Sequence, residues 1–121
     1  DFVTPDGEVV PNHRLTTDPT PPKRFAYMSD TAYTEKHLDL IHGVDCLYHE
    51  STFLTEDAAR IKATLHSSAA QAATLAKKAE VKQLIIGHYS ARYDDRRVFL
   101  DDARAIFPNT QAAFYGSNYI F

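Results

Sequence analysis

Ionisable residues follow three apolar, strand-like segments of this 121-residue chain, at the point where each segment ends. Asp30 follows the first segment, Glu50 the second and His88 the third, and His66 lies just before an alanine-rich segment. Asp and His are zinc ligands, and two metal ions can hold the attacking and leaving oxygens of a phosphodiester. Asp30 and His88 alone are too few for a well-held zinc, so the spacing predicts a metal or acid–base site that lacks partners.

Alternating strands and helices must position these residues. The apolar patterns and capping signals predict a mostly parallel sheet with right-handed crossovers and flanking helices, which is an α/β fold. Thr34 is the predicted start of the first helix, with Gly43 as its stop, and Ser67 or Ser68 begins the alanine-rich one. The predicted strands cover 25–28, 45–49, 81–87 and 111–115, and the predicted helices cover 34–42, 56–64, 67–79 and 95–107.

The first 23 residues have a different character. Asp6-Gly7 is a turn signal between two short β-prone pieces, so we expect a small hairpin. Three prolines within Pro19–Pro22 predict an extended connector, because proline neither donates to a sheet nor continues a helix. We therefore divide the chain into residues 1–23, a hairpin with a proline-rich connector, and residues 24–121, one α/β unit.

Composition narrows the class of protein. The net charge of −3 gives no support for nucleic-acid binding through bulk electrostatics. No apolar run is long enough to span a membrane, and the opening has no signal-peptide pattern. Cys46 is the single cysteine, so we expect no internal disulfide and a reducing, cytoplasmic location. The absence of an initial Met leads us to expect a fragment or a processed chain.

Each candidate also has a structural explanation. Asp30 could cap a turn or a helix, and His88 could be a satisfied polar residue at a strand end. His66 could simply begin a helix, Glu50 could be a solvated loop charge, and Arg92 could form an ion pair or a stack. From the residues alone these explanations are favoured, since isolated polar residues seldom mark sites.

Four motifs, in order, resemble those of the ribonuclease Z family, the tRNA 3′-processing endonucleases of the metallo-β-lactamase superfamily. Ser29-Asp30-Thr31 resembles the family's Gly-Asp-Thr, and His49-Glu50-Ser51-Thr52-Phe53 its His-Glu-Ala-Thr-Phe loop. His66-Ser67-Ser68-Ala69 is similar to its His-Ser-Thr-Ala helix start. Gly87-His88-Tyr89-Ser90-Ala91-Arg92-Tyr93 is similar to its Thr-His-Phe-Ser-x-Arg-Tyr motif. Any one of these motifs is weak evidence, whereas four in the family's order are specific.

The resemblance implies a role for each residue. Asp30 would bridge two zinc ions and His88 would be a ligand of one of them. His66 would protonate the departing 3′ oxygen as general acid, and Glu50 would orient His66. The remaining pair, Ser90 and Arg92, would hold the scissile phosphate, a task that suits a guanidinium group. The intact enzyme would cut precursor tRNA after the discriminator base, leave a 3′ hydroxyl and act as a homodimer.

The chain also departs from the family. Ser29 replaces Gly and Gly87 replaces Thr, both small changes that keep the proposed ligands. The family's His-x-His-x-Asp-His motif is absent, and so is its recognisable tRNA-gripping arm. The resemblance covers the C-terminal half of the αββα sandwich. We therefore expect a fragment that is inactive alone, with an incomplete set of zinc ligands.

Two other functions stay open from the sequence. The first is another hydrolase of the metallo-β-lactamase fold, such as a phosphodiesterase acting on small esters. The second is a non-catalytic α/β interaction module that only scaffolds a partner.

Overall fold

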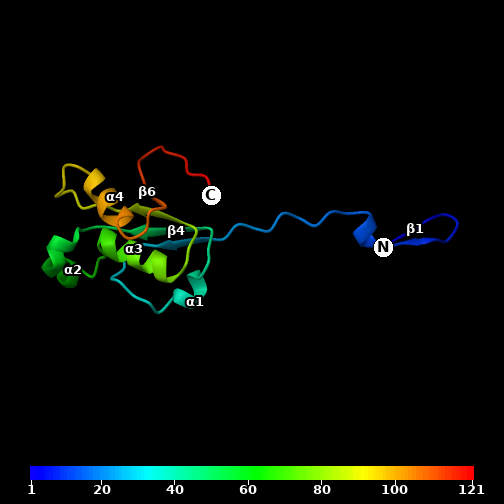
Figure 1. The fold of residues 1–121 in the computed structure, drawn as a ribbon, viewed down its shortest axis with the longest axis horizontal. Helices are drawn as coiled ribbons and strands as arrows, with labels where there is room; N and C mark the ends of the chain where they lie inside the picture. The colour runs from blue at the N-terminus through cyan, green and yellow to red at the C-terminus, as the bar shows by residue number, and fades with distance from the viewer.

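The computed structural model describes residues 1–121 and shows an α/β body preceded by an extended N-terminal segment (Figure 1). The body holds a sheet of four parallel strands in the order β3-β4-β5-β6, with bounds β3 Phe25–Met28, β4 Cys46–Glu50, β5 Gln83–Gly87 and β6 Thr110–Ala112. The predicted fold class is therefore confirmed.

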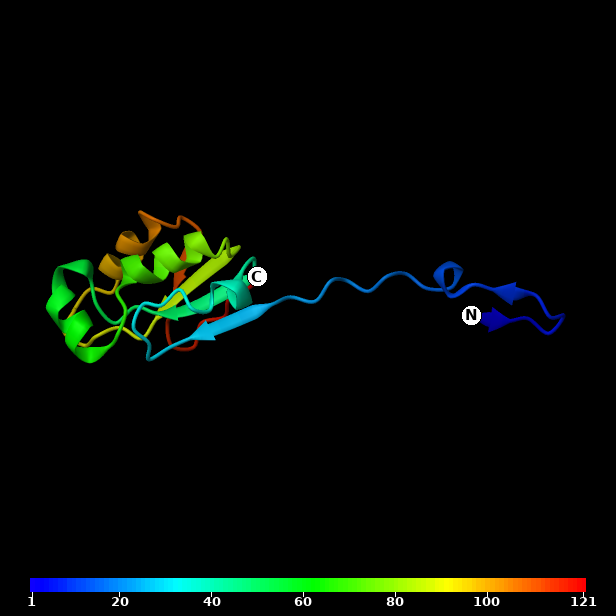
Figure 2. The same cartoon turned by 90° about the horizontal axis from the view of Figure 1, so that it is seen from below.

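The N-terminal segment forms the predicted hairpin. Strand β1 (Phe2–Val3) pairs with β2 (Val9–Val10) in antiparallel register, with Phe2 opposite Val10. The turn of η1 (Asn12–Arg14) follows, and the proline-rich stretch then runs without regular structure to β3. Figure 2 shows the hairpin held away from the body by this stretch. The hairpin therefore contributes nothing to the packing around the sheet.

Helices α3 (Ala69–Lys78) and α4 (Arg97–Arg104) cover one face of the sheet (Figure 2). Small residues on the buried side of α3 let it lie close to the strands. Ser68 caps α3 in a full capping box: its hydroxyl accepts from the Gln71 N–H, and the Gln71 side chain accepts from the Ser68 N–H. The core on this face includes Leu47, Leu75, Leu84, Ile86, Phe99 and four alanines of α3, Ala69, Ala72, Ala73 and Ala76.

The opposite face of the sheet is more open. Phe25 is 52% exposed and Tyr27 is 66% exposed. Tyr27 stacks on Tyr48 with 4.7 Å between the ring centroids, and Phe25 stacks on Phe121 of the C-terminal segment. Aromatic stacking thus gives this face partial cover.

The predicted helix from Thr34 to His42 is wrong in length. The structure has only a four-residue helix, α1 (Leu38–Ile41), whose N-cap His37 makes no side-chain capping bond. The Thr34 hydroxyl instead accepts from the Lys36 N–H two residues later, which closes a local turn. Threonine thus satisfies a backbone donor here without starting a helix.

The other predicted helices are present, with shorter bounds at some ends. The segment predicted at 56–64 is a turn, η2 (Thr55–Asp57), followed by α2 (Ala58–Thr64). The helix predicted at 95–107 is α4, which begins and ends a few residues inside those bounds. None of the helices combines the length and apolar character needed to span a bilayer.

Candidate active site at the carboxyl edge of the sheet

The carboxyl ends of β3, β4 and β5 meet at one edge, because the strands are parallel and in register. Met28 lies opposite His49, and Glu50 lies opposite Gly87. The residues that follow these ends are brought together although they come from distant parts of the chain. This edge is where α/β sheets place their sites.

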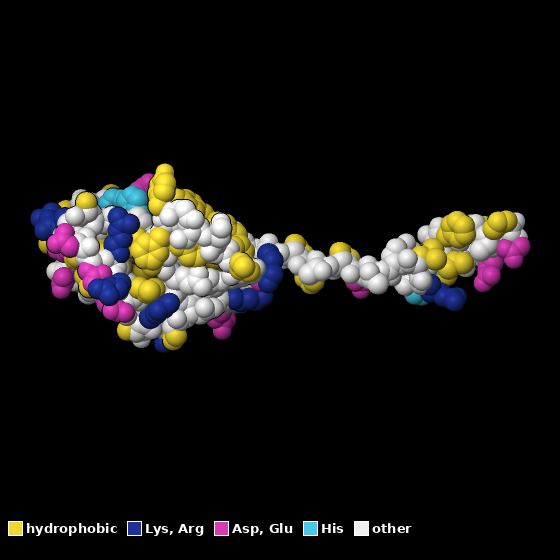
Figure 3. Space-filling view, turned by 90° about the horizontal axis from the view of Figure 1, so that it is seen from above, with side chains coloured by type: hydrophobic (Ala, Val, Ile, Leu, Met, Phe, Trp, Pro, Cys, Tyr) yellow, Lys and Arg dark blue, Asp and Glu magenta, His cyan; other side chains and the backbone are white.

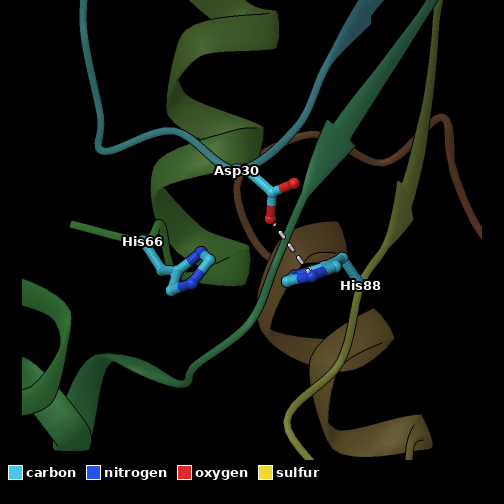
Figure 4. A group of neighbouring side chains, drawn as sticks. All are labelled: Asp30, His66 and His88. Atoms are coloured by element: carbon cyan, nitrogen blue, oxygen red, sulfur yellow. Dashed lines mark ion pairs between the residues drawn. The ribbon is translucent and has the colours of Figure 1, made fainter. Parts of the chain in front are cut away.

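Asp30 and His88 leave their strands through left-handed backbone conformations, with φ of 49° and 60°. This region costs an L-residue roughly 1–2 kcal/mol, and Asp and His tolerate it better than most side chains. Backbone conformations of this kind cluster at active sites. The two side chains face each other, with His88 Nε2 3.3 Å from Asp30 Oδ1 (Figure 4).

His66 approaches the same pair from the start of α3 (Figure 4). Its ring centroid lies 5.3 Å from that of His88. One ligand atom from each of Asp30, His66 and His88 lies within 4.8 Å of the others. A carboxylate oxygen and imidazole nitrogens are the donors that zinc prefers, so the residue types fit a zinc ion, although four ligands are normal.

Glu50 is fully buried directly beneath this group and accepts four hydrogen bonds. Its Oε1 accepts from the Thr31 N–H at 2.6 Å and from His66 Nδ1 at 2.8 Å. Its Oε2 accepts from the Thr52 hydroxyl at 2.6 Å and from the Ser67 N–H at 3.1 Å. Burial alone would raise the pKa of Glu50, but these hydrogen bonds outweigh burial and hold its pKa below the ordinary value.

Glu50 and His66 therefore form an oriented pair. Because Glu50 accepts at Nδ1, the second ring nitrogen of His66, Nε2, stays available to a ligand or a substrate. His66 keeps a quarter of its side chain exposed, whereas Glu50 has none exposed. This is the arrangement of an acid–base residue with a buried orienting carboxylate.

Ser90 and Arg92 are not brought into this cluster by any side-chain contact with it. The Ser90 N–H donates to the Thr52 carbonyl at 3.0 Å, and the Ser90 hydroxyl accepts from the Arg92 N–H at 3.3 Å. The Arg92 side chain is exposed and makes no hydrogen bond or ion pair. The loop is thus anchored beside Thr52 while its guanidinium group stays free.

The two residues at which the sequence analysis noted departures lie in different surroundings. A Cβ atom on Gly87 would lie 2.8 Å from Tyr48 Cζ and closer still to the Tyr48 hydroxyl. Tyr48 thus occupies the space that a threonine side chain at position 87 would need. At Ser29 nothing in the structure explains the departure.

Three hydrogen-bond donors of the site are not predicted from the sequence. They are the Thr52 hydroxyl and the backbone N–H groups of Thr31 and Ser67, all of which donate to Glu50. Each lies inside one of the four motifs quoted above, and this position is the feature of the sequence that could have indicated it. His49 is buried and its Nδ1 lies 2.8 Å from the Glu50 carbonyl oxygen, a structural contact.

Acid should destabilise the chain through two carboxylates. Hydrogen bonds from the Lys82 ammonium and the Arg24 N–H lower the pKa of Asp45 to about 2, and Glu50 also has a lowered pKa. A group with a lowered folded pKa stabilises the fold above its unfolded pKa and loses that contribution as pH falls. We expect the urea midpoint to fall between about pH 4.5 and pH 2 through these carboxylates, after an earlier decline below about pH 6.5 from the buried His49, whose pKa is lowered by burial.

Urea unfolding followed by circular dichroism over this pH range measures the effect. Asp45→Asn should remove part of the dependence, whereas Glu56→Gln, at an exposed position of η2, should leave it unchanged. A midpoint that does not vary with pH would contradict the prediction.

Comparison with known proteins identifies the superfamily to which the chain belongs. The profile of the beta-lactamase superfamily domain matches residues 13–89. Ribonuclease Z from Bacteroides thetaiotaomicron is 55% identical over 93% of this chain, and ribonuclease Z from Parabacteroides distasonis is 58% identical over 91%. The chain spans 36% of the length of each of these curated relatives.

Two solved structures share the fold. The metallo-beta-lactamase fold protein YhfI from Bacillus subtilis superposes with a TM-score of 0.67 at 19% identity, over 74% of this chain and 36% of that one. The short form of human tRNase Z superposes with a TM-score of 0.59 at 24% identity, over 75% of this chain and 30% of that one. The family model that matches residues 13–89 shows that the chain belongs to the beta-lactamase superfamily, and over most of its length the chain is similar to one segment of ribonuclease Z.

Proposed function

We propose that this chain supplies the acid–base side of a zinc-dependent endoribonuclease that matures the 3′ end of precursor tRNA. The observation that carries the proposal is the Glu50–His66 pair, 2.8 Å apart, beside the facing side chains of Asp30 and His88. Relatives named ribonuclease Z match this whole region at 50% identity and more.

Asp30 and His88 would hold metal, with Asp30 as the bridging carboxylate of a two-zinc site. A bound zinc pair lowers the pKa of water and offsets the charge that develops on the phosphoryl oxygens. Two ligands, or three with His66, do not complete a site, so further ligands must come from outside this chain.

His66 would give its proton to the departing 3′ oxygen through Nε2, while Glu50 holds the ring through Nδ1. Ser90 and Arg92 would bind the scissile phosphate; the exposed Arg92 guanidinium has no other partner and carries the charge that this role needs. The proposed acid and the proposed phosphate-binding residues all lie at or beside the carboxyl edge of the sheet.

A cavity of about 580 Å³ is lined by His66 and lies between α2, α3 and the loop that carries Tyr33. Ile61 and Leu65 give it apolar walls, and Lys62 places a cation at its rim. This volume suits a nucleoside, since ligand sites range over roughly 300–1,000 Å³. We propose that the nucleoside carrying the leaving 3′ oxygen binds here, because His66, the proposed acid, is one of the residues that line the cavity.

The bulk charge of the chain does not add to RNA binding. On the face of the body in Figure 3, basic and acidic side chains are interspersed. The precursor tRNA would be gripped mainly by surfaces outside this chain. The proposal extends to a homodimer in the cytoplasm, as the family implies, and the free, buried Cys46 suits a reducing compartment.

A chimera tests the function. This chain replaces the matching segment of the Bacteroides thetaiotaomicron ribonuclease Z, and the product is assayed on precursor tRNA and on bis(p-nitrophenyl) phosphate. We expect cleavage of the precursor at its 3′ end. A folded chimera that hydrolyses only the small ester would favour another hydrolase of the fold, and one that binds RNA but cuts neither substrate would favour an interaction module.

Zinc binding by the chain alone is expected to be weak, because the ligand set is incomplete. Isothermal titration of zinc into the metal-free chain measures it, with Asp30→Asn as the matched variant that keeps size and removes charge. Tight binding of two zinc ions would contradict the prediction and would mean that this chain holds the full ligand set.

A further inference from the structure

The hydroxyl of Thr52 touches both halves of the proposed site. Thr52 Oγ1 lies 2.6 Å from Glu50 Oε2 and 2.8 Å from His88 Nδ1. Thr52 is 7% exposed, and its carbonyl accepts from the Ser90 N–H, so the residue is held between the ends of β4 and β5. A chain of hydrogen bonds therefore runs from His66 through Glu50 and Thr52 to His88.

The number of available hydrogens determines which atom donates in each of these hydrogen bonds. A threonine hydroxyl has one hydrogen to donate. Glu50 is surrounded by three other donors, from Thr31, His66 and Ser67, so its carboxylate acts only as an acceptor. The Thr52 hydrogen must therefore point at Glu50, because the two oxygens could not otherwise lie 2.6 Å apart.

The consequence falls on His88. Since the Thr52 hydrogen is used, the Thr52 oxygen can only accept on the side of His88, and His88 Nδ1 must carry the hydrogen. The lone pair of the neutral ring is then on Nε2, which is the atom 3.3 Å from Asp30 Oδ1. A metal ion bound by Asp30 would meet a free lone pair without any rearrangement of the ring.

We propose that Thr52 is a positioning residue that fixes the tautomer and ring orientation of His88 and ties them to the Glu50–His66 pair. The metal-binding part of this inference rests on the proposed function, whereas the tautomer does not. Without the hydroxyl, Nδ1 of His88 loses its acceptor, and both tautomers and both ring orientations become available. Residues behind a metal-binding histidine commonly contribute 10–100-fold to metal affinity.

The tautomer can be read directly by nitrogen NMR of the metal-free, ¹⁵N-labelled chain, recorded at alkaline pH where the His88 ring shifts no longer change with pH. We expect the His88 spectrum of a ring protonated at Nδ1, with Nε2 as the unprotonated nitrogen. Thr52→Val removes the hydroxyl at nearly constant shape and should give a mixture of tautomers. Thr52→Ser restores a hydroxyl and should restore the single tautomer.

Thr110→Val is the matched control, because Thr110 is also buried and hydrogen-bonded but begins β6 at the opposite edge of the sheet. It should leave the His88 spectrum unchanged. Amide spectra report whether each variant folds. If Thr52→Val does not fold, the parent chain still decides: a His88 ring protonated at Nε2 would overturn the proposal. A folded Thr52→Val with the parent tautomer would overturn it equally.

The effect of Thr52 on zinc binding is measured in the chimera. Thr52→Val should weaken zinc binding about 10–100-fold, and Thr52→Ser should bind within a few-fold of the parent. If the chimera fails to cut precursor tRNA while the His88 tautomer follows the hydroxyl, the proposed function fails and the positioning role stands. If cleavage occurs and the tautomer ignores Thr52, the positioning role fails alone.

Discussion

Glu50→Ala is expected to lower the free energy of unfolding of this chain by about 3–5 kcal/mol, the range for removing one partner of a buried charged pair. Glu50 accepts four hydrogen bonds with no exposed surface, so its removal leaves the buried donors of Thr52 and Ser67, and the partly buried donors of Thr31 and His66, without their acceptor. Unsatisfied buried donors cost about 1–3 kcal/mol each, and water entering the space left would offset part of that.

Urea unfolding measures the loss, and two variants calibrate it. Glu50→Gln keeps the size of the side chain but places its NH2 group against two of the four donors. Its free energy of unfolding should therefore lie between those of the parent and of Glu50→Ala. Glu80→Ala removes an exposed carboxylate that pairs with His42, and such a pair contributes at most about 1 kcal/mol. Equal effects of Glu50→Ala and Glu80→Ala would show that Glu50 does not organise the site.

The sequence predicts which residues gather at this edge, because the signal is local. Apolar segments end at Asp30, Glu50 and His88, and parallel strands bring such ends together. Helix α3 is equally local, since Ser68 and Gln71 form its capping box within one turn. Patterns that close within a few residues can be read without knowledge of the fold.

The remaining features depend on register and on competition between local structures. The bond between Thr52 and His88 joins residues 36 apart and exists only because Glu50 pairs with Gly87. Thr34 has the chemistry of a helix cap and closes a turn instead. No spacing rule predicts a contact that is set by strand pairing, nor which of two local bonds a threonine will form.

His66→Ala in the chimera is expected to reduce kcat on precursor tRNA by about 10²–10⁴-fold, the usual contribution of a general acid. The departing 3′ oxygen of a nucleoside is a poor leaving group that needs a proton. The nitrophenolate of bis(p-nitrophenyl) phosphate needs none, so the same variant should lose little activity on that ester. His42→Ala is the control, because His42 pairs with Glu80 at the surface.

Comparing the two substrates distinguishes two roles for His66, general acid and metal ligand, because its position is compatible with both. Ligand atoms of Asp30, His66 and His88 lie within 4.8 Å of one another, so His66 has the position of a third metal ligand as well as that of an acid. A ligand would be needed for both substrates, and its loss would reduce both rates and the zinc affinity together. An acid oriented by Glu50 is needed only where the leaving oxygen must be protonated, and its loss would leave zinc affinity unchanged.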